Sequence, residues 1–275
     1  MKYCGRFSKR IKMDKFDEIS IIYQRQSKEL LEFLTRHPNQ KIILVVNSQD
    51  FEEFYDNKTW ELVNAIAERA PESNLNICFY DASKCEVIDD KLQQCIDNIK
   101  IPYFFGFIAN DFEKLNYLCS KGVSEVYLAE EICFDLTRAK RVCDRYGVKI
   151  RAFANVAQSS LKTGPALKKF FIRPEDVPVY EDIIDTLEFW GPLDRQETLL
   201  NIYKQGYWFG DLREIILDLS CAIDSRTLVP VFAQARKDCQ RKCLKGGACS
   251  ICDRLVSIGE KLSDQGYIIK IKKNH

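Results

Sequence analysis

Histidine is nearly absent from this sequence, which has two histidines in 275 residues. His37 stands immediately before Pro38, where we expect a helix to end, and His275 is the last residue. Neither position suits a catalytic base, so the sequence argues against a Ser-His-Asp or Cys-His hydrolase and against a catalytic metal held by histidines. General acid or base chemistry would therefore fall to carboxylates.

Long hydrophobic runs are also missing. No segment approaches the roughly eighteen apolar residues that a membrane-spanning helix needs. The opening stretch, MKYCGRFSKRIKMDKF, is too polar to contain the apolar core of a signal peptide. These absences predict a cytoplasmic protein without a membrane partner.

Cytoplasmic thiols stay reduced, so the twelve cysteines are not expected to form a disulfide framework. Clustered cysteines in such a protein are more often metal ligands, whereas isolated ones pack as small apolar side chains. Eight cysteines lie apart from one another and are predicted to be structural: Cys4, Cys78, Cys85, Cys95, Cys119, Cys133, Cys143 and Cys221.

Glycine-rich phosphate-binding turns are absent as well. The segment IIYQRQSKELL, which leaves the first strand-like run, contains no glycine, so an open dinucleotide-binding sheet is poorly supported. The chain has no P-loop, no HExxH motif and no kinase signature. A peptidase is consequently the weakest of the enzyme hypotheses.

Short apolar runs rich in β-branched and aromatic residues alternate with stretches of helical period, which is typical of βα units with a parallel sheet. We predict a compact (β/α)8 TIM-like barrel over residues 15–225, with an open doubly wound sheet as the alternative. An extension of residues 1–14 precedes it, and a basic cysteine-rich segment of residues 226–275 follows. The eight predicted strands are residues 18–23, 41–47, 75–81, 101–107, 124–130, 148–155, 169–176 and 185–191.

Four polar residues close or interrupt these apolar runs and are the candidate catalytic residues. They are Glu130, Asn155, Arg173 and Glu188. In a barrel the active site lies at the carboxyl ends of the strands, so we expect these four side chains to converge on one pocket. The alternative for each is a helix cap or an internal ion pair.

The densest motif is the group of four cysteines Cys239, Cys243, Cys249 and Cys252, with the spacing C-x3-C-x5-C-x2-C. A glycine pair between the second and third cysteine lets the chain fold back, so that four thiolates can meet. Such a set suits an iron–sulfur cluster or a tetrahedral zinc ion, and the spacing alone does not choose between them. Four unligated thiols remain the third alternative.

Positive charge is concentrated around these cysteines. From Ala233 to the end the chain has ten Lys or Arg and four Asp or Glu, against a net charge of +1 for the whole protein. We therefore predict weak, salt-sensitive binding of RNA or DNA phosphates, with Arg241, Lys242 and Lys245 as the main contacts. The alternative is that these lysines and arginines only keep the protein soluble.

Three segments resemble the collagenase-like peptidase superfamily: YGVKIRAFANVAQS (146–159), KFFIRPEDVPVYEDIIDTLEFWG (169–191) and AEEICFDLTRAKRVCDRYG (129–147). The resemblance implies a TIM-like barrel and, as in several members, cysteines that hold a [4Fe-4S] cluster. Such members take part in oxygen-independent hydroxylation of RNA bases or quinone precursors, and others are peptidases. This chain differs in its bunched cysteines and in Pro192, where the family usually has arginine.

The leading functional hypothesis is an iron–sulfur barrel enzyme, or an enzyme subunit, that modifies RNA or a small aromatic substrate. The alternative from another class is a non-catalytic binding protein, stabilised by zinc, whose basic C-terminal segment engages nucleic acid or a protein partner.

Overall fold

The structure is a computed structural model of the 275-residue chain. It describes residues 18–22, 27–47, 51–80, 90–129, 132, 135–156, 171–191, 193–217, 219 and 224–225. Within these ranges the chain is an α/β fold built on one parallel sheet. The predicted class of fold is thereby confirmed at this level.

Eight strands form the sheet, in the order β4-β3-β2-β1-β8-β7-β6-β5, and every pairing is parallel. Sequence neighbours therefore lie side by side, as expected for βα units. The strands are β1 (Glu18–Ile22), β2 (Lys41–Asn47), β3 (Asn74–Tyr80), β4 (Tyr103–Gly106), β5 (Ile108–Ala109), β6 (Glu125–Leu128), β7 (Lys149–Phe153) and β8 (Thr186–Phe189).

The two ends of this strand order, β4 and β5, are separated in the chain only by Phe107. Side chains alternate between the two faces of the sheet without interruption across that residue. Phe104 and Ile108 pack on one face, and Phe105 and Phe107 pack on the other. Residues 103–109 thus behave as a single extended segment, which pairs with β3 through its first half and with β6 through its second half.

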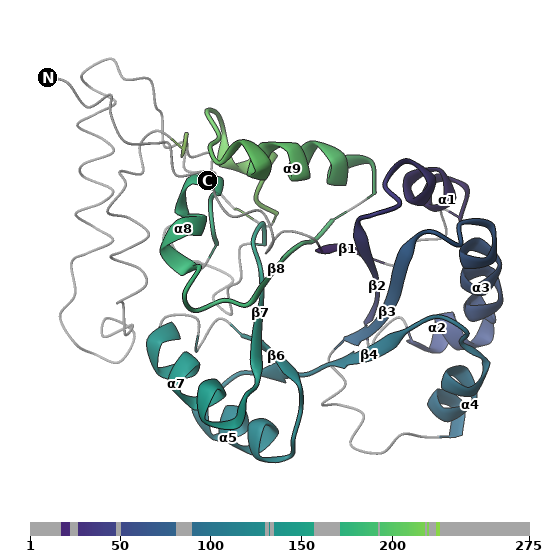
Figure 1. Cartoon of the computed structure of the whole chain (residues 1–275), viewed down its shortest axis with the longest axis horizontal. Coiled ribbons are helices and arrows are strands. Elements are labelled where there is room, and N and C mark those ends of the chain that lie inside the picture. The colour runs from purple at the N-terminus through teal and green to yellow at the C-terminus, as the bar shows by residue number, and fades with distance from the viewer. Residues whose placement is uncertain are drawn as a thin grey trace, which may run out of the picture.

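The helices lie on the outer side of the strands, which curve around a common centre (Figure 1). Aliphatic side chains of the helices and of the outer sheet face, among them Leu34, Leu44 and Leu115, form the main core. The helices are α1 (Ser27–Arg36), α2 (Phe51–Asp56), α3 (Thr59–Arg69), α4 (Asp90–Asn98), α5 (Phe112–Ser120), α7 (Leu136–Tyr146), α8 (Val177–Tyr180) and α9 (Leu193–Gln205).

Local signals account for several helix boundaries. Asp111 caps α5, because its side chain accepts a hydrogen bond from the backbone N–H of Lys114 at 2.7 Å. Gly147 ends α7 in the left-handed region, with a φ of 71°. Asp135, the residue before α7, makes no capping hydrogen bond through its side chain.

The strand predicted at residues 169–176 is wrong where the structure describes it. Pro174–Asp176 form the 3-10 helix η4, and Ile172 makes one sheet-like hydrogen bond, from its N–H to the carbonyl of Ala154 at 3.0 Å. Proline at 174 has no N–H and a fixed φ, which favour a helical turn over a strand. The eighth strand of the sheet is instead β5.

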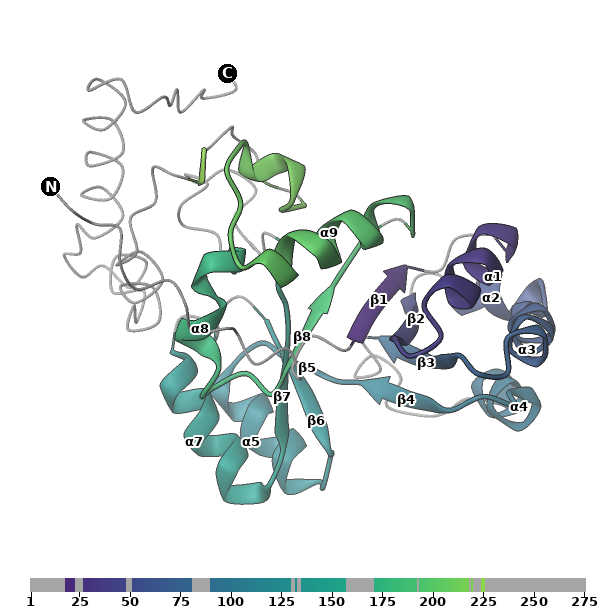
Figure 2. The ribbon, with the colours of Figure 1, turned by 45° about the horizontal axis from the view of Figure 1, so that its top comes forward.

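The segment that follows α9 lies beyond one end of strands β7 and β8 (Figure 2). A second 3-10 helix, η5 (Leu212–Glu214), follows α9, and the N–H of Leu217 donates to the carbonyl of Asn155 at 2.7 Å. In the parts of the chain that the structure describes, every helix is too short or too polar to cross a membrane.

Candidate functional site

The inner face of the sheet, opposite the helices, carries a second and smaller core. Ile43, Val45, Cys78, Tyr127 and Phe153 are buried there. Tyr80, Phe104, Ile108, Val156 and Trp190 pack against them and are partly buried. The sequence shows only apolar runs at these positions, because a parallel strand covered on both faces is apolar throughout.

Four rings on this face form what we call the aromatic cluster: Tyr80, Tyr127, Phe153 and Trp190. Phe153 lies at the centre, with its ring centroid 4.6 Å from Trp190, 5.2 Å from Tyr127 and 5.7 Å from Tyr80. Tyr80 is the last residue of β3, Phe153 the last of β7, and Trp190 follows β8 directly. The cluster therefore marks the carboxyl ends of these strands, where barrel enzymes place their active sites.

Gly106 makes room for these rings. It pairs with Tyr80 in the sheet and faces inward. A Cβ at this position would lie 2.9 Å from Cys78 Sγ and 3.1 Å from ring atoms of both Tyr80 and Tyr127. The absence of a side chain at Gly106 is thus a condition for the aromatic cluster to pack as it does.

Three charged side chains and one tyrosine meet beside the rings and form what we call the inner charged cluster: Glu125, Arg151, Glu188 and Tyr127. The Tyr127 hydroxyl donates to Glu188 Oε1 at 2.7 Å, and Arg151 Nη1 pairs with the same oxygen. Arg151 Nε lies 2.6 Å from Glu125 Oε2, and the guanidinium is 5.0 Å from the centre of the Phe104 ring. Arg151 is thus held between two carboxylates on strands β6 and β8.

Burial keeps Tyr127 and the neighbouring Cys78 protonated. It raises the pKa of Tyr127 well above its usual value, and the neighbouring Glu188 carboxylate raises it further. The pKa of Cys78 is raised for the same two reasons, in the same order. At neutral pH the phenol is therefore a hydrogen-bond donor and the thiol is protonated, so neither is a nucleophile in this state.

Asn155 lies just beyond β7, and both ends of its side-chain amide bond the main chain of one neighbour, Trp190. Nδ2 donates to the carbonyl of Trp190 at 2.7 Å, and Oδ1 accepts from the Trp190 N–H at 2.7 Å. This pair of bonds replaces the backbone ladder at the point where β7 and β8 end. Asn155 thus fixes the main chain of an aromatic-cluster residue.

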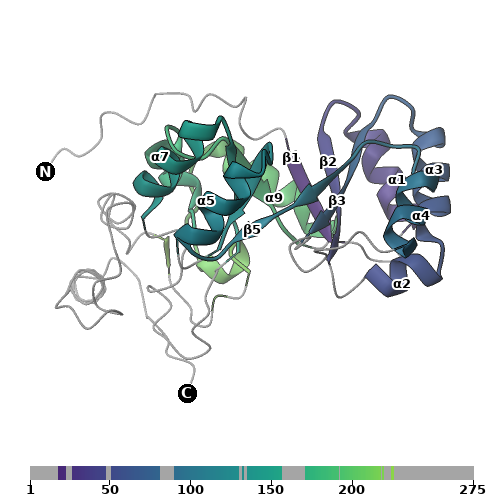
Figure 3. The same ribbon diagram turned by 90° about the horizontal axis from the view of Figure 1, so that it is seen from below.

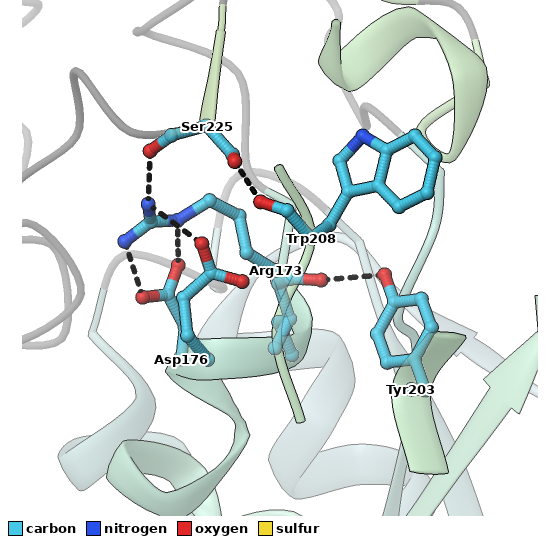
Figure 4. A network of polar contacts seen from close by, with 7 residues as sticks. Arg173, Asp176, Tyr203, Trp208 and Ser225 are labelled. Atoms are coloured by element: carbon cyan, nitrogen blue, oxygen red, sulfur yellow. Dashed lines mark hydrogen bonds and ion pairs between the residues drawn. The ribbon is translucent and has the colours of Figure 1, made fainter. Parts of the chain in front are cut away.

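Arg173 is buried in a separate network, which Figure 4 shows from close by. It binds Asp176 with two hydrogen bonds, from Nε at 2.7 Å and from Nη2 at 2.6 Å. Nη1 donates to Glu175 Oε1 at 3.2 Å and to the carbonyl of Ser225 at 2.9 Å. We call Arg173, Glu175, Asp176 and Ser225 the Arg173 network.

The Arg173 network connects three segments of chain. The Ser225 hydroxyl donates to the carbonyl of Trp208, and the Tyr203 hydroxyl donates to the carbonyl of Ile172 at 2.7 Å (Figure 4). Burial alone would lower the pKa of Arg173, but the facing Asp176 and Glu175 carboxylates raise it, so the guanidinium stays charged. Burial raises the pKa of Glu175. These contacts give the network a structural role, holding η4 against the segment that ends at Ser225.

The predicted catalytic residues thus lie in different surroundings. Glu188 belongs to the inner charged cluster, and Asn155 adjoins the aromatic cluster through Trp190. Arg173 pairs instead with carboxylates close to it in sequence. Glu130 lies outside the described residues, as do the four clustered cysteines and Arg241, Lys242 and Lys245.

Sequence reasoning missed Arg151, Glu125 and Tyr127. A signal for Arg151 was present, because an arginine in the middle of the apolar run VKIRAFAN must find a partner once the strand is buried. Tyr127 and Glu125 gave no such signal. Polar residues at alternate positions of a strand are equally expected when that face of the sheet simply meets solvent.

Metal ligands are not gathered in the described part of the chain. Across its ranges no group of three or more His, Cys, Asp or Glu side chains is arranged to hold a metal ion. Cys78, Cys95, Cys119 and Cys143 are buried and form no disulfide bonds, as expected for cysteines that pack as small apolar side chains.

The sequence was also compared with known proteins. No protein-family model matches the chain, and no curated protein matches it.

Proposed function

We propose that the protein is a barrel enzyme, or an enzyme subunit, that modifies a planar aromatic group, either an RNA base or a small aromatic compound. The observation that carries this proposal is the aromatic cluster at the carboxyl ends of β3, β7 and β8, with a buried carboxylate, Glu188, beside it. Tyr80 and Trp190 are only partly buried, so ring surface remains for a planar ligand to stack on.

The proposal includes closure of the sheet into a barrel. Because residues 103–109 pair with β3 at one end and with β6 at the other, each strand would have two neighbours. The result would be a ring of seven strands, with the inner core as its filling. This differs from the eight-stranded barrel of the sequence prediction, since the segment at 171–176 does not enter the sheet as a strand.

The inner charged cluster supplies the acid–base chemistry in this proposal. Glu188 is a carboxylate within hydrogen-bond distance of a phenol, and Arg151 stabilises its charge. Such a carboxylate could accept a proton from a ring substituent of the substrate. Tyr127 would donate a hydrogen bond to the carboxylate and keep it oriented.

The proposal includes a metal site, and its only support is the spacing of the four clustered cysteines in the sequence. The described residues offer no metal-binding group, so a metal would be held by Cys239, Cys243, Cys249 and Cys252. We propose a [4Fe-4S] cluster there, with zinc as the alternative. A cluster would supply electrons for a redox modification.

A stacking test addresses the aromatic cluster directly. The probes are cytidine and 4-hydroxybenzoate, titrated into the protein while the heat of binding is followed by isothermal titration calorimetry. Trp190→Leu should weaken binding of the active probe by about 5- to 150-fold, because stacking on one ring contributes about 1–3 kcal/mol. Trp60→Leu, in the outer core, is the matched control and should retain binding if it folds. Equal loss in both variants, or binding of neither probe to the wild type, would refute the proposal.

The metal is tested by analysis of protein purified without oxygen. Brown protein that contains iron and sulfide would support the iron–sulfur proposal. Colourless protein that contains one zinc ion per chain would support the alternative, a zinc-stabilised binding protein. Cys249→Ser should lose the metal, while Cys119→Ala, in a buried helix position, should retain it. Full metal content in Cys249→Ser would rule out the four-cysteine site.

A further inference from the structure

Helix α7 differs in charge from the other helices that the structure describes. It contains four cationic residues and one anionic residue, Asp144, for a net charge of +3. The sequences of α1, α5, α8 and α9 are neutral, and those of α2, α3 and α4 are negative. A helix that only needed to be soluble would not require this excess.

Three of the four cations share one face of α7. Arg138, Arg141 and Arg145 follow one another at intervals of three and four residues, which places them in one row on a helix. The buried side of the helix is formed by Leu136, Ala139 and Cys143, so the row points outward. We call these three arginines the α7 ridge.

The α7 ridge has no acidic partner among the described residues. Lys140 is the cation of α7 that pairs with Asp144, and it lies outside the row. Arg138 packs over the ring of Phe112 on α5, 3.9 Å from its centre, and Arg141 Nε donates to the carbonyl of Thr137 at 3.4 Å. These contacts orient two of the guanidinium groups while leaving their charge uncompensated.

Exposed tyrosines lie on α7 and on the neighbouring helix α5. Helices α5 and α7 pack side by side on the same part of the molecule (Figures 1 and 3). Tyr117 on α5 is 58% exposed and Tyr146 at the end of α7 is 45% exposed. Lys121 lies over the Tyr117 ring, 5.4 Å from its centre, and adds a further cation.

We propose that the α7 ridge, with Tyr117 and Tyr146, binds a single strand of nucleic acid. Arginines in a row neutralise successive phosphates, and exposed rings stack on bases that are not paired. An acidic protein would meet the same charges, and failure of the wild type to bind either strand of nucleic acid would favour that partner instead. The surface is distinct from the basic C-terminal segment.

The position of the ridge connects it with the aromatic cluster. Helix α7 follows strand β6, so its first turn, near Arg138, lies toward the carboxyl ends of the strands. A strand bound along the ridge would therefore run toward the aromatic cluster. The inference itself does not rest on the proposed function, because binding is measured without any reaction.

The test is a fluorescence anisotropy titration of the full-length protein with a labelled twenty-nucleotide RNA of mixed sequence, and with the DNA of the same sequence. The test variant changes Arg138, Arg141 and Arg145 to Gln, which keeps helix propensity high. The control variant changes Lys91, Lys100 and Lys204 to Gln, which removes the same charge from exposed positions on other helices and loops. Thermal unfolding of each protein verifies that it folds.

We expect the test variant to bind at least about tenfold more weakly at low salt, and the control to bind within about threefold of wild type. The slope of log Kd against log salt should fall by about 2 in the test variant, since each phosphate contact on a single strand contributes about 0.7. Tyr117→Ser should weaken binding without changing that slope. RNA and DNA bound equally would indicate recognition of phosphate and base stacking without the 2′-hydroxyl.

Three results would overturn the proposal. The first is that the wild type binds neither strand at low salt. The second is that the test and control variants bind equally. The third is that changing Arg241, Lys242 and Lys245 to Gln abolishes binding while the test variant keeps it, which would assign binding to the C-terminal segment alone. If the triple variant does not fold, the single change Arg145→Glu is used, with Lys204→Glu as its control.

Discussion

Arg151 and Arg173 are both buried arginines between carboxylates, but their partners lie at different distances along the chain. Arg173 binds Glu175 and Asp176, two and three residues further on. Arg151 binds Glu125 and Glu188, which belong to the two neighbouring strands. The first network can form as soon as η4 folds, whereas the second needs the sheet to be assembled.

The difference matters for function as well. The Arg173 network satisfies its charges locally and ties η4 to Ser225, so it stabilises the chain around the candidate site. The inner charged cluster brings charges from three strands to the aromatic cluster. Replacing such a buried ion pair by apolar side chains often leaves stability unchanged or raises it, so the proposed function gives a reason for retaining this one.

The largest expected effect comes from removing Arg173. Arg173→Met keeps the length of the side chain but leaves two carboxylates without their cation, one of them fully buried. Such a change costs about 3–5 kcal/mol of unfolding free energy. Urea unfolding followed by circular dichroism measures it.

The control for Arg173 is Arg213→Met. Arg213 also binds one aspartate, Asp211, with Nη2 at 2.6 Å from the carboxylate, but 43% of its side chain is exposed. Surface pairs contribute less than about 1 kcal/mol. Similar losses of unfolding free energy in Arg173→Met and Arg213→Met would show that Arg173 is not the charged centre of a buried network.

The second effect comes from the inner charged cluster. Glu188→Gln keeps the volume but removes one of the two carboxylates that hold Arg151, and Glu125 remains. We expect a cost of about 1–3 kcal/mol in the urea assay, smaller than for Arg173→Met. The variant should also lose binding or turnover of the aromatic probe, because the carboxylate is the proposed proton acceptor.

Glu197→Gln is the matched control for Glu188. Glu197 pairs with Arg36 at 2.9 Å on the surface, where both side chains are about half exposed. It should change the free energy of unfolding by less than about 0.5 kcal/mol and should leave probe binding unchanged. If Glu188→Gln changes stability and probe binding as little as this control does, the inner charged cluster has no role in the proposed function.

The third effect concerns the space that Gly106 leaves for the rings. Gly106→Ala places a methyl group 2.9 Å from Cys78 Sγ and should cost about 1–3 kcal/mol through overpacking. The near-ultraviolet circular dichroism of the aromatic cluster should change with it. The double variant with Cys78→Ala should recover part of this loss, because the sulfur atom is removed.

Gly147→Ala provides the comparison for Gly106. Gly147 has a φ of +71° and no atom within 4 Å of an added Cβ, so its cost of about 1 kcal/mol reflects backbone strain alone. Its near-ultraviolet spectrum should match that of the wild type. Absence of coupling between Gly106→Ala and Cys78→Ala would contradict the close packing at Gly106.

The smallest effect is a pH dependence at Glu175. Burial raises the pKa of this carboxyl above its ordinary value of 4.5, so the folded protein holds the proton more tightly than the unfolded chain. The stability that Glu175 contributes is therefore lost as the pH rises from about 4.5 through the folded pKa. Relative to wild type, Glu175→Gln should gain stability over this interval and then stay level. Urea unfolding at several pH values measures the difference, and a constant difference would contradict the raised pKa.

The sequence determined the α/β class, seven of its eight predicted strands and several helix ends. Apolar runs alternating with helical periods require these features, and Asp111 and Gly147 set boundaries through local hydrogen bonds and a positive φ. It also located Asn155 and Glu188 as polar residues in apolar surroundings. Proline at 174 carried a local signal that the strand prediction for 169–176 overlooked.

Only the tertiary structure decided which charges meet and what fills the inner face of the sheet. Arg151 finds Glu188 because β7 and β8 are neighbours in a particular register, and no local pattern encodes that register. Gly106 matters because Cys78, Tyr80 and Tyr127 reach the same place from two other strands. The physical reason is that backbone propensity acts over a few residues, whereas the pairing of buried charges and the packing of rings depend on segments brought together by the whole sheet.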